Sequence, residues 1–227
     1  MGAGIAALAA SAGVPVVLLD IPASDGDASS PARKGLERQL KIRPPAFMDG
    51  GRAALITTGN TRDHLSLLAE CDLVLEAIIE QLEPKKDLYA RLESVRKPDG
   101  IIASNTSGIP MKDLVEGRST GFRERFLGMH FFNPPRYLHL LEVIAAPDTS
   151  EATLAAARAF SERVLGKGTI RAKDVPGFVA NRLGVYGMVL ALRMLDEFAL
   201  SIDEVDAITG PALGRAKSAT FRTADLT

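Results

Sequence analysis

The chain has 227 residues, of which 46% are hydrophobic and 24% are charged. A chain of this length and composition can bury a substantial core and forms one or two globular domains. Its 27 Lys and Arg residues nearly balance its 28 Asp and Glu residues, which excludes an overall field that would attract nucleic acid or an anionic membrane. Any recognition of an anion is therefore local.

The N-terminal stretch has the features of neither a secretion signal nor a membrane anchor. Residues 2–19 carry no charge, but a signal peptide needs a basic segment first, and the chain opens with Met1-Gly2-Ala3. Gly13 and Pro15 interrupt the stretch and disfavour membrane insertion. The single cysteine, Cys71, excludes an internal disulfide and fits a reducing compartment. We therefore expect a cytoplasmic protein.

The first 103 residues alternate between helical segments and short apolar strands. The predicted helices cover 4–12, 32–42, 61–69 and 84–96, and the predicted strands cover 14–19, 53–57, 73–79 and 101–103. Strands that are apolar throughout and separated by helices indicate a parallel sheet with both faces covered. The pattern predicts a doubly wound α/β domain.

The second half begins with strands and ends with helices. Two strands are predicted at 126–132 and 140–145, followed by a helix at 151–165 and a strand at 169–172. Beyond Val175-Pro176-Gly177 the pattern is helical, over 178–200 and 202–208. We therefore expect an α/β domain over residues 1–174 and a helical C-terminal domain over residues 175–227.

Two features at the start of the chain are typical of a dinucleotide site. Asp20 ends the second segment of a helix-then-strand unit, where a carboxylate accepts the ribose hydroxyls of NAD and repels the 2′-phosphate of NADP. Gly2 matches the third glycine of a Gly-x-Gly-x-x-Gly turn, because the helix begins at once. A turn or capping aspartate is an equal alternative for Asp20 taken alone.

The strand that should precede this glycine turn has no counterpart in the sequence. In a doubly wound sheet that strand is central, so its loss leaves two parallel neighbours unpaired on one side. We expect a chain that is truncated at its N-terminal end and that folds poorly or needs a partner.

A histidine and a glutamate on the two strands at 126–132 and 140–145 form a candidate acid–base pair. His130 lies near the end of the first strand, and Glu142 lies among apolar residues of the second. A buried carboxylate is costly unless it is paired, and a carboxylate that orients an imidazole makes the ring a competent base. The alternatives are a structural histidine, and an ion pair of Glu142 with Arg136 or Lys173. His64 and His139 are weaker candidates, and three scattered histidines with one cysteine show no metal-ligand spacing.

A cluster of polar residues, Ser104-Asn105-Thr106-Ser107, follows the strand at 101–103. Ligands of parallel sheets sit at this carboxyl edge, where hydroxyl and amide groups can hold them. A plain turn or helix cap is the alternative.

Four segments together resemble the L-3-hydroxyacyl-coenzyme A dehydrogenase family over essentially the whole chain. They are Asp72-Leu73-Val74-Leu75-Glu76-Ala77-Ile78-Ile79-Glu80, Ser104-Asn105-Thr106-Ser107, Gly128-Met129-His130-Phe131-Phe132-Asn133-Pro134 and Pro176-Gly177-Phe178-Val179-Ala180-Asn181. The residues at 210–223 look like the dehydrogenase part of bacterial hydratase-dehydrogenase fusion proteins. By this resemblance the chain is also cut short at its C-terminal end.

The resemblance implies a Rossmann-type NAD-binding domain and NAD-dependent oxidation of L-3-hydroxyacyl-CoA in fatty-acid β-oxidation. It makes His130 the catalytic base, which Glu142 orients, while Ser107 and Asn181 hold substrate oxygens. The cofactor would contact Gly2, Asp20, Glu80, Lys85 and Asn105. An acyl-CoA is the expected substrate, and a homodimer the expected state of the full-length protein. The alternatives are a dehydrogenase acting on 3-hydroxybutyryl-CoA or a sugar acid, and a non-catalytic relative or fragment.

Overall fold

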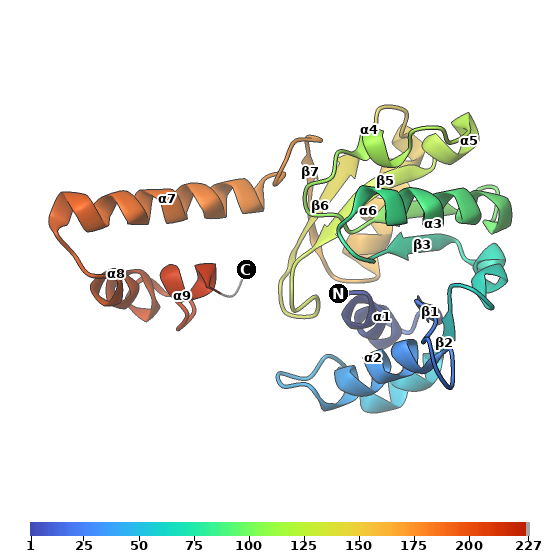
Figure 1. The fold of residues 1–227 in the computed structure, drawn as a ribbon, viewed down its shortest axis with the longest axis horizontal. Coiled ribbons are helices and arrows are strands. Elements are labelled where there is room, and N and C mark those ends of the chain that lie inside the picture. Colours follow the sequence, from blue (N-terminus) through green and yellow to red (C-terminus); the bar gives the residue numbers. More distant parts are fainter. Residues whose placement is uncertain (226–227) are drawn as a thin grey trace. The chain divides into compact units, whose positions relative to one another are not determined.

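The computed structural model describes residues 1–225, which divide into two compact units. The first unit, Met1–Pro176, combines helices and strands, and the second, from Gly177 onward, contains helices (Figure 1). This confirms the predicted α/β fold of Rossmann type with a helical C-terminal region. None of the helices within residues 1–225 is long and apolar enough to cross a membrane.

Fifteen elements make up the first unit and four the second, counting the described residues. In the first unit these are α1 (Gly2–Ser11), β1 (Val16–Asp20), α2 (Ser30–Lys41), η1 (Gly50–Leu55), β2 (Ile56–Asn60), η2 (Leu65–Glu70), β3 (Leu73–Glu76), α3 (Leu82–Val95), β4 (Ile101–Ser104), α4 (Met111–Leu114), α5 (Thr120–Arg123), β5 (Phe126–Phe131), β6 (Leu140–Ala145), α6 (Glu151–Arg163) and β7 (Gly168–Ala172). The second contains α7 (Ala180–Phe198), α8 (Ile202–Thr209), η3 (Pro211–Leu213) and α9 (Phe221–Ala224).

Between residues 50 and 70, the predicted strand is displaced to Ile56–Asn60 (β2) and the predicted α-helix is wrong. The segment predicted as a strand at 53–57 is mostly the 3-10 helix η1, which begins where the Asp49 carboxylate accepts a hydrogen bond from the Gly51 N–H. The segment predicted as an α-helix at 61–69 opens as a turn, because the Asn60 side-chain oxygen accepts from the Arg62 and Asp63 N–H groups. Side chains of this kind compete with the helix for backbone donors, and only the 3-10 helix η2 follows.

The strands form two separate sheets. β1 pairs in parallel with β2, while the second sheet has the order β3-β4-β5-β6-β7. In the larger sheet only the β5–β6 pair is antiparallel. Within the described residues, β1 and β3 are not paired with each other.

Helix α1 packs against both sheets. Its Ile5 and Leu8 side chains belong to the core cluster of the five-stranded sheet, with Leu73 and Leu75 of β3 against that cluster. Small alanines on the helix pack instead with β1 and β2, in a cluster that contains Ala6, Ala7 and Ala10. The helix therefore holds the two sheets in place.

Each face of the five-stranded sheet is covered by its own set of helices (Figure 1). Leu154 and Ala157 of α6 join Ile5 and Leu8 of α1 on one face. On the other face, Tyr89 of α3 meets the Phe126 ring of β5 edge-on, with centroids 5.2 Å apart. Alternate residues of a strand point to opposite faces, so β5 directs Phe126, Gly128 and His130 toward the α3 side.

Candidate active site

His130 and Glu142 face each other across the antiparallel strands β5 and β6. They are register partners, and the Nδ1 atom of His130 lies 2.6 Å from the Oε2 atom of Glu142. His130 is only 4% exposed and Glu142 is fully buried. The ring of Phe132 meets the imidazole edge-on, with centroids 4.6 Å apart. The carboxylate therefore fixes the orientation of the imidazole ring.

Arg136 and Lys173, the alternative partners of Glu142, and His64, the alternative histidine, make other contacts. The Arg136 guanidinium donates to the carbonyls of Pro45 and Phe47, both at 2.8 Å, and Lys173 lines a pocket near the end of β7. The Nδ1 atom of His64 accepts from the Asn60 N–H. His130 is thus the histidine that the structure pairs with a buried carboxylate.

The turn after β4 reaches the strand that carries His130. The Asn105 side-chain oxygen accepts a hydrogen bond from the Phe131 N–H at 2.9 Å. The Asn105 N–H itself donates to the Glu76 carbonyl at 2.8 Å. Asn105 is therefore fixed between the end of β3 and the residue that follows His130.

Glu80 holds the same turn from the other side. Its Oε1 atom accepts from the Thr106 hydroxyl at 2.5 Å and from the Ser107 N–H at 2.7 Å. Burial raises the pKa of Glu80, but these two hydrogen bonds and the charge of Lys85 outweigh it, so the pKa lies below its ordinary value. Ser107 is exposed, which leaves its hydroxyl available to a ligand.

Lys85 is a buried cation shared by two carboxylates. Its Nζ atom lies 2.7 Å from Oε1 of Glu76 and 3.3 Å from Oε2 of Glu80, and its side chain is only 1% exposed. Of the predicted cofactor residues, Glu80, Lys85 and Asn105 thus lie together at the carboxyl ends of β3 and β4.

Sequence reasoning assigned no role to Glu76. Its carboxylate accepts from the Tyr89 hydroxyl at 2.6 Å and from the Ser104 hydroxyl at 2.8 Å, in addition to Lys85. Burial, together with the neighbouring charge of Glu76, raises the pKa of Tyr89 well above its ordinary value. Glu76 is a charged residue within the apolar run at 73–79. The same pattern, a carboxylate within an apolar strand, made Glu142 a candidate.

Gly2 and Asp20 lie at the start of α1 and at the end of β1. A Cβ atom on Gly2 would lie 3.7 Å from the Cβ atom of Ala77, so α1 begins beside the carboxyl end of β3. The first turn of α1 carries no acidic residue and no side-chain cap, which leaves donors for a phosphate. Asp20 ends β1 in an exposed position, and its Oδ1 atom accepts from the Ile21 N–H. These positions fit the two ends of a dinucleotide.

Asn181 belongs to the second unit. It lies in the first turn of α7 and is exposed there.

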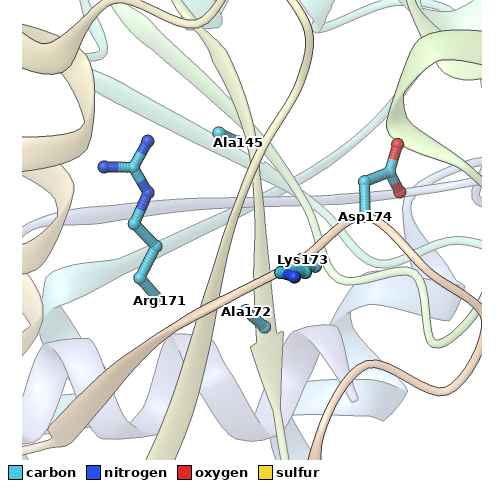
Figure 2. A pocket seen from close by; sticks show the side chains of 5 residues that line it. All are labelled: Ala145, Arg171, Ala172, Lys173 and Asp174. Atoms are coloured by element: carbon cyan, nitrogen blue, oxygen red, sulfur yellow. The ribbon is translucent and has the colours of Figure 1, made fainter.

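Two pockets are lined by residues other than His130 and Glu142. One is lined by Ala145, Arg171, Ala172, Lys173 and Asp174, with Arg171 and Asp174 on opposite sides of the chain (Figure 2). It contains none of the predicted site residues. The second lies at the end of α2 and is lined by Gln39, Leu40, Arg43, Pro45, Phe47, Met48, Gly50 and Arg136. Within residues 1–225, no group of three or more His, Cys, Asp or Glu side chains is arranged to hold a metal ion.

Comparison with known proteins shows the family of this chain. The family model described as "3-hydroxyacyl-CoA dehydrogenase, NAD binding domain" matches residues 1–175. A protein of Deinococcus radiodurans, "Probable 3-hydroxyacyl-CoA dehydrogenase", is 57% identical over 227 residues, which are 100% of this chain and 66% of that protein. The human "Hydroxyacyl-coenzyme A dehydrogenase, mitochondrial" is 36% identical over 214 residues, which are 91% of this chain and 66% of that protein.

Solved structures are similar as well. The crystal structure of M. tuberculosis FadB2 has a TM-score of 0.83 and 33% identity, covering 100% of this chain and 78% of that one. The (S)-3-hydroxybutyryl-CoA dehydrogenase PaaH1 of Ralstonia eutropha has a TM-score of 0.75 and 33% identity, covering 92% of this chain and 72% of that one.

The chain spans slightly less than two thirds of the length of the two relatives named above. The matched domain, the identity over the full chain and the shared fold all lead to the same result. The chain belongs to the 3-hydroxyacyl-CoA dehydrogenase family.

Proposed function

We propose that this chain carries the NAD-binding and catalytic part of an enzyme that oxidises L-3-hydroxyacyl-CoA to 3-oxoacyl-CoA in fatty-acid β-oxidation. The observation that carries the proposal is the buried His130–Glu142 pair, with Nδ1 and Oε2 at 2.6 Å. A histidine held in this way is suited to removing a proton from an alcohol.

In the proposed reaction, His130 accepts the proton of the 3-hydroxyl group through Nε2. Glu142 stabilises the imidazolium that results, because its charge is buried next to the ring. NAD, when bound, supplies the acceptor for the hydride that leaves C3. Ser107 and Asn181 are proposed to hold the substrate oxygen as it acquires carbonyl character.

The cofactor is proposed to lie across the carboxyl ends of β1, β3 and β4. Asp20 would accept the hydroxyls of the adenine-side ribose, and the start of α1 at Gly2 would face the pyrophosphate. Glu80, Lys85 and Asn105 would line the nicotinamide side, and the Lys85–Glu80 ion pair and the hydrogen bond from Phe131 to Asn105 support this proposal.

An acyl-CoA substrate is supported by the basic character of α2 and its end. Lys34, Arg38, Lys41 and Arg43 lie in or just after this helix, and Arg43 lines the pocket that also contains Arg136. Guanidinium and ammonium groups bind phosphate well. We propose that this region contacts the nucleotide end of CoA.

A homodimer is proposed for the full-length protein. Apolar side chains are exposed along α7 in the second unit, among them Leu183, Val185, Tyr186 and Leu192. Exposed apolar patches of this kind mark association surfaces.

The test is NADH formation from L-3-hydroxybutyryl-CoA and L-3-hydroxydecanoyl-CoA by a protein that contains residues 1–227, compared with its His130→Asn variant. We expect the parent protein to oxidise the substrate, and we expect the rate of NADH formation by the variant to be at least about 100-fold lower. Oxidation of the four-carbon substrate alone would favour a 3-hydroxybutyryl-CoA dehydrogenase, the activity named for the Ralstonia structure. A folded protein inactive on both substrates would refute the proposal.

A further inference from the structure

We propose that Glu76 is a positioning residue that fixes the turn of residues 104–109 against the cofactor side of the sheet. The proposal rests on the function proposed above, in which this turn contributes Asn105 and Ser107. Nothing in the reaction requires Glu76 itself to touch the cofactor or the substrate.

Glu76 is a carboxylate buried at the carboxyl end of β3. Its side chain is fully buried, and four donors point at it. Oε1 accepts from the Ile78 N–H and Lys85 Nζ, both at 2.7 Å, and Oε2 accepts from the Tyr89 and Ser104 hydroxyls at 2.6 and 2.8 Å. A charge is costly to bury, but here every oxygen is satisfied twice.

One route from Glu76 to the turn runs through Lys85. The ammonium group that Glu76 holds at 2.7 Å also lies 3.3 Å from Oε2 of Glu80. The other oxygen of Glu80 accepts from the Thr106 hydroxyl at 2.5 Å and the Ser107 N–H at 2.7 Å. Lys85 therefore orients the carboxylate that binds the backbone next to the Ser107 side chain.

A second route runs through Ser104. Its hydroxyl donates to Oε2 of Glu76 and accepts from the Thr106 N–H at 3.2 Å. The Glu76 main-chain carbonyl also accepts from the Asn105 N–H at 2.8 Å. Glu76 thus holds Asn105 directly, and holds Thr106 and Ser107 through Ser104, Lys85 and Glu80.

The buried ion pair of Glu76 and Lys85 is not explained by stability alone. Replacing a buried ion pair with well-packed apolar side chains is often neutral or stabilising, so such a pair is weak evidence of a purely structural role. Its hydrogen bonds lead to the turn that carries Asn105 and Ser107. The geometry therefore points to alignment of this turn as the role of the charge.

The test compares Glu76→Gln with Glu93→Gln. Glutamine keeps the shape and much of the hydrogen bonding of Glu76 but removes its charge. Glu93, on the same helix as Lys85, accepts from the Ser119 N–H at 2.8 Å and from Arg118 at 3.1 Å, which makes it a matched carboxylate away from the turn. Two quantities are measured: the dissociation constant of NADH by fluorescence, and hydrogen exchange over residues 104–109 without cofactor.

We expect Glu76→Gln to weaken NADH binding by about tenfold, the scale of one charged hydrogen bond, and to speed exchange over residues 104–109. Glu93→Gln should leave both quantities within about twofold of the parent protein, even where its melting temperature falls equally. A folded Glu76→Gln protein with parental NADH affinity and parental exchange would overturn the proposal.

A second variant tests the proposal if Glu76→Gln does not fold. It removes only the Ser104 hydroxyl, which links Glu76 to the Thr106 N–H. Ser104→Ala keeps the charge of Glu76 and is expected to speed exchange at Thr106. No change there would then overturn the proposal. If the parent protein does not bind NADH but the exchange effects appear, the proposed function fails while the positioning role of Glu76 stands.

Discussion

His130 and Glu142 are register partners on antiparallel strands, with Nδ1 and Oε2 2.6 Å apart in a buried environment. Neighbouring strands fix this distance, so the imidazole is oriented before any ligand arrives. Orientation achieved in advance costs nothing at the moment of reaction.

Glu142→Gln should therefore slow the reaction without removing the cofactor site. We expect kcat for L-3-hydroxyacyl-CoA oxidation to fall by about 100-fold or more, because the amide cannot stabilise the imidazolium. The dissociation constant of NADH should change by less than about threefold, because Glu142 is not among the residues proposed to bind the cofactor. Steady-state kinetics and NADH fluorescence measure the two effects. Glu151→Gln, which alters an exposed carboxylate paired with Arg171, is the control, and a fall in kcat of the same size there would contradict the assignment.

Asp20→Ala tests the adenine end of the cofactor site. Loss of a carboxylate that accepts ribose hydroxyls should weaken NAD binding by about tenfold and reduce the preference for NAD over NADP. Calorimetric titration with both nucleotides measures this. Asp25→Ala removes a second exposed carboxylate from the loop that follows β1 and should leave both affinities unchanged. Equal NAD affinity in the parent and Asp20→Ala proteins would exclude Asp20 from the site.

The stability contribution of Glu80 should depend on pH. Its pKa in the folded protein lies below the ordinary value of 4.5, so the folded state favours the charged form. The contribution is then complete above the pKa of the unfolded chain and disappears as the pH falls through the folded value. Because Glu80 is about half exposed, we expect it to be below about 1 kcal/mol. Denaturant unfolding of the parent and Glu80→Gln proteins between pH 7 and the acid limit should show two curves that converge at low pH. A difference that stays constant would contradict this linkage.

The open edges of β1 and β3 should be visible in hydrogen exchange. Each of these strands is paired on one side, whereas β4 is paired on both sides. Backbone groups without a partner strand are protected poorly, so amides on the open edges of β1 and β3 should exchange faster than those of β4. Mass spectrometry of deuterated peptides gives the comparison. Protection equal to that of β4 would mean that the edges are covered in solution.

The sequence predicted the elements whose periodicity is strong and whose ends are marked. Pro84 places the start of α3, and Gly13 follows the end of α1 with a φ of +87°. The strand predicted at 53–57 lies instead at Ile56–Asn60, and the α-helix predicted at 61–69 is a turn followed by η2. In both places a single side chain, Asp49 or Asn60, accepts hydrogen bonds from nearby backbone N–H groups. Such local competition leaves little trace in hydrophobic periodicity.

In the candidate site, too, some features could be predicted from the sequence and others could not. A buried carboxylate and a histidine on two strands joined by a reversal could be expected to meet, and they do. Glu76 could have been found by the same reasoning, since it is the charged residue of an apolar strand. Its partners could not, because Lys85, Tyr89 and Ser104 come from two other elements whose packing against β3 the sequence does not specify.

Helix α1 packs against both of the sheets that carry the proposed cofactor residues. Asp20 stands on the small sheet, whereas Glu80, Lys85 and Asn105 lie at the edge of the large one, and α1 packs against both. Small shifts of this helix would therefore change the span between the adenine and nicotinamide ends without altering any residue that touches the nucleotide. Ala7 and Ala10 are fully buried in the cluster that α1 forms with the small sheet, so a larger side chain at either position would displace the helix.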